Sequence, residues 1–146
     1  MLGDGPVRAL QIFLRPKAPD LEPMVQFHEF PEESSVDSWR LIVGSPLTVR
    51  SDILVFDARI SKGAQLRLPN AEAGRNILLY VYSGKVALRD EVISEGESVF
   101  TTAFDQHPTA LEASDVVLFS FDPEAEVYRG GMFSGNQRRP VLAPAR

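Results

Sequence analysis

The fold of this chain is decided by residues 63–84, which read GAQLRLPNAEAGRNILLYVYSG. The stretch begins with a short alternation of polar and apolar residues and continues through a polar connection into the apolar run 77–82. Because residues 77–82 are apolar on both sides of an extended chain, we expect a strand that is covered on both faces. Gly84 then predicts a tight turn between two apolar runs, so residues 76–89 are expected to form a β-hairpin.

Strand patterns also occur on both sides of this stretch. Most apolar segments are short, rich in β-branched and aromatic residues, and bounded by turn-forming residues, which is typical of strands. The one helix candidate is residues 31–38, where two glutamates would suit a first turn. We therefore expect an all-β fold, an antiparallel barrel or sandwich. The predicted strands are residues 7–14, 24–30, 39–43, 46–49, 52–60, 64–68, 76–83, 85–89, 97–102, 109–112 and 115–121.

The length of 146 residues suits one domain. We place this domain at residues 1–128 and a C-terminal tail at residues 129–146. The tail is expected either to be disordered or to lie across the barrel or a partner subunit.

Charge and cysteine content narrow the function classes. The net charge is −5, from 15 basic and 20 acidic residues, and no basic cluster exceeds Arg138 and Arg139, so nucleic-acid binding is not expected. The chain has no cysteine, which leaves no disulfides and no thiolate chemistry. The N-terminus lacks the continuous apolar core of a signal peptide, and no segment is long enough to span a bilayer. We therefore expect a cytoplasmic protein without membrane contact.

Residues 63–84 resemble the first metal-binding motif of the cupin family, G-x5-H-x-H-x3-4-E-x6-G. In this alignment the two histidine positions carry Pro69 and Ala71. The carboxylate position carries Asn76 when it is counted forward from Ala71 with a spacer of four residues, or Ile77 when it is counted back from Gly84. None of these side chains is an ordinary metal ligand. We therefore expect no metal and no cofactor in this chain.

The order of motifs along residues 9–122 is similar to the C-terminal half of the pirin-like bicupins, the group that includes the bacterial quercetin 2,3-dioxygenases. ALQIFLRP at residues 9–16 resembles the strand that follows their first barrel, and residues 21–30 resemble the crossover that comes next. These bicupins bind their metal in the first barrel. The resemblance therefore implies a cupin-like (RmlC-like) jelly roll that corresponds to the second, metal-free barrel alone.

Two functions follow from this resemblance. The chain is either a non-catalytic pirin-like module that binds a small ligand or a protein, or a fragment or accessory subunit of a metal-dependent quercetinase-type dioxygenase. The missing ligands favour the first function and the family resemblance supports the second. In the second case a separate cupin chain would carry the metal-binding barrel.

Individual polar residues give little support for catalysis. His107 occupies the histidine position of the second cupin motif counted from Gly96, but the proline, glycine and asparagine of that motif become Thr102, Phe104 and Leu111. His107 is therefore either a remnant of a ligand set or a turn residue before Pro108. His28 is expected at a surface or an interface. We find no Gly-x-Ser-x-Gly elbow and assign no catalytic residue.

A small anionic ligand is the remaining small-molecule possibility. Gln65 and Arg67 alternate with two leucines, so one face of this strand is polar. If that face points inward, Arg67, Arg75 and His107 meet at the mouth of the barrel and favour an anion; if it points outward, they are surface residues.

The two-faced strand 77–82 also predicts an oligomer. An exposed apolar face of that size would be unusual on a monomer. We therefore expect a homodimer in which a second subunit covers the strand, with the N-terminal strand 7–14 and the C-terminal tail crossing between subunits.

Overall fold

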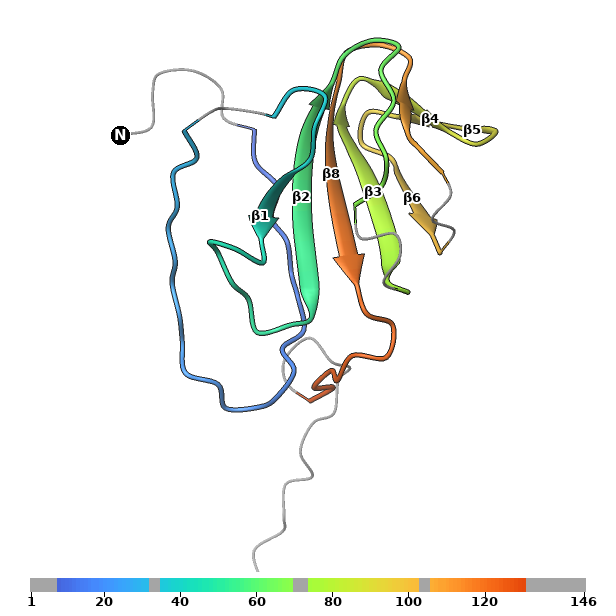
Figure 1. Ribbon diagram of the computed structural model, residues 1–146. Helices are drawn as coiled ribbons and strands as arrows, with labels where there is room; N and C mark the ends of the chain where they lie inside the picture. Colours follow the sequence, from blue (N-terminus) through green and yellow to red (C-terminus); the bar gives the residue numbers. More distant parts are fainter. Residues whose placement is uncertain (1–7, 32–34, 70–73, 103–105, 131–146) are drawn as a thin grey trace, which may run out of the picture.

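The computed structural model describes residues 8–31, 35–69, 74–102 and 106–130. Within these ranges the chain contains eight strands in two antiparallel sheets and no helix, which confirms the expected all-β fold (Figure 1). The expected helix at 31–38 is wrong for Pro31 and residues 35–38; residues 32–34 lie outside the described ranges. No helix that could cross a membrane is found in the part of the chain that the structure describes.

The larger sheet has five strands in the order β1-β2-β8-β3-β6. Its long central strands are β2 (Ile53–Ile60), β8 (Ser114–Phe121) and β3 (Asn76–Ser83), each of eight residues. The edges are β1 (Arg40–Val43) and β6 (Ser98–Thr101). The chain therefore places residues from both of its halves side by side at the centre of this sheet.

The smaller sheet has three strands in the order β5-β4-β7. They are β5 (Glu91–Ser94), β4 (Lys85–Leu88) and β7 (Thr109–Ala110). Gln65 adds an isolated antiparallel bridge to Thr109, so the predicted strand 64–68 lies along this sheet without becoming a full strand. The hairpin β4–β5 was not predicted from the sequence.

The hydrophobic core lies between the two sheets. Along β8 the buried side chains alternate with half-buried ones, as expected for a strand whose two faces meet different surroundings. Burial of one large aliphatic side chain contributes roughly 1.5–3 kcal/mol, so this core is the main source of stability. Its fully buried aliphatic members include Ile60, Leu68, Ile77, Leu79, Val81, Val86, Val116 and Leu118.

Residues 76–89 do not form the predicted hairpin. β3 pairs with β6 and β8, whereas β4 pairs with β5 and β7, so the chain passes from one sheet to the other at Gly84. Gly84 has a φ of +86°, and a Cβ atom there would lie 2.5 Å from the carbonyl oxygen of Ala113. Gly84 therefore lies at a bend between the two sheets instead of in the turn of a hairpin, and its lack of a side chain allows the sheets to meet closely.

The first two predicted strands are also wrong. Residues 8–14 and 24–30 are in no strand of either sheet; residue 7 lies outside the described ranges. Figure 1 shows this part of the chain as a wide blue loop that first runs down beside the larger sheet and then returns at a distance from it. We call residues 8–31 the N-terminal segment.

Candidate functional site

The interior between the sheets is filled by apolar side chains. Ile77, one of the two positions that match the cupin carboxylate, is fully buried in this core. Pro69 and Asn76 are half-buried, and Ala71 lies outside the described residues. Across the described ranges, no group of three or more His, Cys, Asp or Glu side chains lies close enough to hold a metal ion.

Arg67 lies on the outward face of its segment. Gln65 and Arg67 are exposed while Leu66 and Leu68 are buried, so the leucines face the core. The Gln65 amide donates to Thr109 Oγ1 at 3.2 Å, and the bridge between these residues places Arg67 opposite His107 when its register is extended.

His107 and its neighbour Gln106 each bury a polar atom. The Nδ1 atom of His107 and the Nε2 atom of Gln106 have no hydrogen-bond partner in the structure as described. Both residues are half-buried overall. Buried polar atoms are usually hydrogen-bonded, often to an ordered water, so these two atoms mark a polar spot beside the smaller sheet.

Arg75 is held in another part of the fold. Its guanidinium donates to Ser120 Oγ at 3.1 Å and to the Ser120 carbonyl oxygen at 3.0 Å. It also forms an ion pair of 2.7 Å with Asp52. These contacts join the start of β3 to the ends of β2 and β8, so Arg75 acts as a structural anchor of the larger sheet. The structure thus attaches Arg75 to the larger sheet, whereas Arg67 and His107 lie on either side of the bridge between Gln65 and Thr109, beside the smaller sheet.

The outer face of the larger sheet is partly covered by residues 8–17 of the same chain. At one end the Arg8 guanidinium lies 4.7 Å from the centre of the Tyr82 ring and forms an ion pair of 2.9 Å with Glu95. At the other end the Lys17 amide donates to the Arg50 carbonyl oxygen at 2.8 Å. This cover leaves an apolar cleft of about 400 Å³ over the sheet, lined in part by Phe13, Ile53, Leu78, Phe119, Phe121 and Val127.

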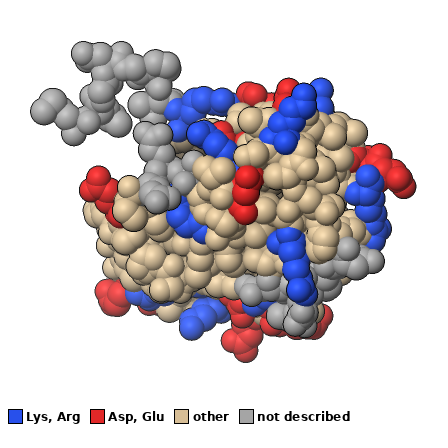
Figure 2. Space-filling view, turned by 45° about the horizontal axis from the view of Figure 1, so that its top comes forward, with Lys and Arg blue, Asp and Glu red and all other residues tan. Residues whose placement is uncertain are grey.

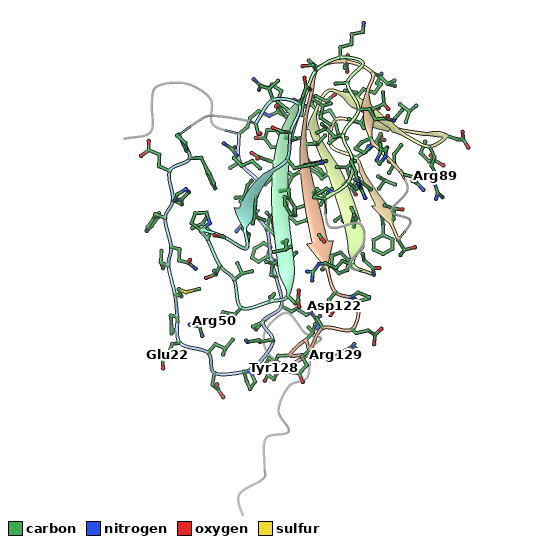
Figure 3. All side chains as sticks on the ribbon, viewed as in Figure 1. Glu22, Arg50, Arg89, Asp122, Tyr128 and Arg129 are labelled. Atoms are coloured by element: carbon green, nitrogen blue, oxygen red, sulfur yellow. The ribbon has the colours of Figure 1, made fainter. Side chains whose placement is uncertain are left out.

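Residues 18–31 stand further from the body of the protein. A second cleft of about 430 Å³ separates them from the segment after β1, and it is lined by both Glu22 and Arg50. Figure 3 shows these two residues near the lower end of the loop. The cleft is otherwise mostly apolar, with Ile12, Leu14, Met24, Val43, Leu47 and Val49 among its lining residues.

Several large apolar side chains of the N-terminal segment are mostly exposed. Phe27 is 92% exposed, Val25 77% and Phe13 71%. Val25 and Phe27 lie two residues apart on one face of an extended chain, and exposed apolar patches mark protein contacts more often than isolated exposed residues do. These residues are predicted from the sequence to lie in strands, and no local feature of the sequence indicates that the strands would lack partners.

The charged surface has no single dominant sign in Figure 2, where acidic and basic side chains are interspersed. One acidic group on β8 is perturbed: the hydrogen bond from Arg59 lowers the pKa of Asp115, and a hydrogen bond from Ser83 acts in the same direction. Burial opposes these effects. Asp115 therefore remains a charged partner of Arg59, and we assign it no catalytic role.

Comparison with known proteins identifies the class of fold to which this architecture belongs. No family model matches the chain, and no curated protein is similar to it. Among solved structures, a Cupin 2 conserved barrel domain protein from Salinispora arenicola matches with a TM-score of 0.53 and 9% identity, over 69% of this chain and 92% of that chain. The described residues therefore have a cupin fold, as expected from the sequence.

The resemblance extends to a bacterial pirin. YhhW from Escherichia coli matches with a TM-score of 0.61 and 19% identity, over 74% of this chain and 47% of that chain. The structure of bacterial pirin YhhW in complex with nickel(II) matches with a TM-score of 0.51 and 20% identity, over 61% and 41%. The chain spans about half the length of this pirin, and at these identities the likeness concerns the fold.

Proposed function

We propose that this chain is a non-catalytic cupin-fold module that contacts another protein chain through its N-terminal segment. The observation that carries the proposal is the contrast between the inside and the outside of the fold. The space where a cupin would hold a ligand is occupied by buried aliphatic side chains such as Ile77, Leu79 and Leu118. The exposed aromatic side chains of Phe13 and Phe27 lie instead on the N-terminal segment.

Physical reasoning favours a protein contact over solvent exposure for this segment. An exposed phenylalanine or valine leaves apolar area in water, and removing that area from water contributes about 25 cal/mol per Å². A partner surface that covered the exposed apolar side chains of the N-terminal segment would collect this contribution at one interface. They are Leu10, Ile12, Phe13, Leu14, Met24, Val25 and Phe27.

A photo-crosslinking experiment tests this function. A photoreactive phenylalanine at position 27 of the full chain is compared with the same group at position 92, where Val92 is exposed on β5 of the other sheet. We expect position 27 to give a discrete adduct whose partner chain is identified by mass spectrometry, and position 92 to give none. Equal labelling at both positions, or no adduct at 27, would contradict the proposal.

The alternative function is an accessory subunit of a quercetinase-type dioxygenase. It is supported by the similarity to YhhW, which is about twice as long as the matched region and has been crystallised in complex with nickel(II). In this alternative a separate cupin chain carries the metal. Elemental analysis separates the two functions: stoichiometric metal in the purified chain alone would contradict the non-catalytic module, whereas metal that enters only with a co-purified cupin chain would favour the accessory subunit.

Binding of a small anion is the remaining possibility. The buried, unpartnered atoms of Gln106 and His107 support it, because an anion or a water could satisfy the Gln106 amide. A thermal shift on addition of inorganic phosphate that disappears in Gln106→Leu would support this possibility. An unchanged melting temperature with phosphate would exclude it.

A further inference from the structure

Residues 18–31 form a stretch of backbone that is not paired with any other described part of the chain. None of their N–H or C=O groups makes a backbone–backbone hydrogen bond within the described part of the chain, although neighbouring Lys17 does. An extended segment with free backbone groups is a ready template for pairing with another strand. Within the described part of the chain, residues 18–31 therefore offer an unpaired edge as well as apolar side chains.

Side chains on one face of this extended segment contact the rest of the protein or one another. The side-chain amide of Gln26 donates from Nε2 to the Thr48 carbonyl oxygen at 2.6 Å, and its Oε1 accepts from the backbone N–H of Thr48 at 3.1 Å. Two residues on, His28 packs edge-on against Phe30 at 4.5 Å between ring centroids, and the Arg40 guanidinium lies 4.7 Å from the Phe30 ring centre. The even-numbered side chains thus hold the segment in an extended conformation, which lowers the entropic cost of pairing.

The odd-numbered side chains face solvent. Val25 and Phe27 are the two most exposed apolar residues of the segment, and Glu29 is exposed beside them. Side chains that lie directly opposite each other in an antiparallel pair are on the same face. A partner strand must therefore match odd positions with odd positions if the exposed apolar face is to continue across the pair.

The prolines decide the register. Pro23 and Pro31 lack a backbone donor, so the window that can pair without interruption is residues 24–30. The centre of this window is Phe27. A two-fold axis through Phe27 lets all seven residues of two copies pair, whereas an axis through Val25 sets Phe27 against Pro23, and an axis through Glu29 sets two carboxylates against each other.

We propose that residues 24–30 of two copies of this chain pair as antiparallel strands about a two-fold axis at Phe27. The inference rests on the proposed function and names a second copy as the partner. In this register Phe27 lies opposite Phe27, Val25 opposite Glu29, and Gln26 opposite His28, so no like charges face each other directly. The contact is the same on both copies and closes as a dimer.

Cysteine substitution tests this register, because the chain contains no cysteine of its own. Opposite Cα atoms in an antiparallel pair are about 4.5–5.5 Å apart, which is within the range of a disulfide. We expect Phe27→Cys to form a disulfide-linked dimer on mild oxidation. Val92→Cys is the matched control, since Val92 is 54% exposed on β5 of the smaller sheet, and it should stay uncross-linked.

A mixture of two variants tests the pairing more sharply. Val25→Cys mixed with Glu29→Cys should form a mixed disulfide, because these positions are opposite each other. Val25→Cys alone should not cross-link, since its two copies would be offset by four residues, ~13 Å along the strands. Circular dichroism of each variant checks that the fold is kept, which is expected for side chains that point into solvent.

Two results would overturn the self-pairing. One is cross-linking of Val92→Cys to the same extent as Phe27→Cys, which would indicate random collision. The other is a wild-type chain that stays monomeric at micromolar concentration. If the chain is monomeric and the photoreactive group at position 27 still labels a different, identified protein, the self-pairing is overturned and the proposed interaction function stands. If position 27 labels nothing, both are overturned.

Discussion

Arg40 and Asp57 are directly opposite each other on β1 and β2 and form a bidentate ion pair. The Arg40 Nε atom donates to Asp57 Oδ1 at 2.9 Å, a second bond joins Nη2 to Oδ2, and the two side chains are only 19% and 21% exposed. The same guanidinium covers the Phe30 ring. One side chain thus connects the edge of the larger sheet to the anchored face of the N-terminal segment.

Removal of this ion pair should lower stability and loosen the segment. Arg40→Ala leaves the half-buried Asp57 carboxylate without its partner, and we expect the free energy of unfolding in urea to fall by about 1–3 kcal/mol. Hydrogen–deuterium exchange near Phe30 should also become faster. The matched control is Lys62→Ala on the exposed turn after β2, which should change stability by less than about 0.5 kcal/mol. An Arg40→Ala variant as stable as this control would contradict the role of the pair.

Gly84 should be far less tolerant of alanine than Gly96. Both glycines have a positive φ, +86° and +83°, so each Gly→Ala change carries a similar backbone cost of about 1–2 kcal/mol. Only at Gly84 would the new Cβ meet backbone, 2.5 Å from the Ala113 carbonyl oxygen and 2.8 Å from the Ser114 Cα, whereas Gly96 has nothing within 4 Å. Urea denaturation should therefore show the larger loss for Gly84→Ala. Equal losses would mean that the two sheets can separate at this point.

Arg75 is expected to act on stability. Arg75→Ala removes the hydrogen bonds to Ser120, which is fully buried, and the ion pair to Asp52. We expect a loss of about 1–3 kcal/mol in the free energy of unfolding. If Arg75 instead belonged to an anion site, the substitution would leave stability almost unchanged and abolish a phosphate-dependent thermal shift. These two readouts therefore distinguish an anchor from a ligand-binding residue.

Asp115 gives the protein a defined acid sensitivity. Because the Arg59 hydrogen bond lowers its pKa in the folded state from the ordinary value of 3.8, the carboxylate stabilises the fold above that value. This contribution is lost as the pH falls through the lower, folded-state pKa. The loss of stability between neutral pH and pH values below 3.8 should therefore be smaller in Asp115→Asn than in wild type. Parallel curves of unfolding free energy against pH would contradict this role; the effect is modest, since both partners are partly exposed.

Much of the fold could be predicted from short apolar runs and period-two patterns. Residues 76–83 form β3 as expected, and the predicted strands 52–60 and 115–121 differ from β2 and β8 by one residue at one end. These strands bury most or all of one face in the core, which is why their pattern is strong. Residues 8–14 and 24–30 carry similar residues without a partner strand, and a local pattern cannot show whether a partner exists. The hairpin predicted at Gly84 is also wrong. A turn within one sheet and a passage between two sheets both require a glycine, so the local sequence does not distinguish them.

The candidate site was harder to predict than the fold. The alternation of Gln65 and Arg67 with two leucines fitted either orientation, and only the burial of Leu66 and Leu68 shows which face is turned inward. Whether Arg67, Arg75 or His107 binds a ligand stays a prediction. The exposure of Val25 and Phe27 can be seen only in the tertiary structure, because it depends on which parts of the chain pack beside residues 24–30.

The most direct test of the central claim is sedimentation velocity of the full chain at micromolar concentration, for wild type, Phe27→Asp and Val92→Asp. Our account predicts a dimer for wild type and for Val92→Asp, and a monomer for Phe27→Asp, because two opposed carboxylates would replace an aromatic pair at the two-fold axis. A monomeric wild-type chain, or a dimer that persists in Phe27→Asp, would contradict it.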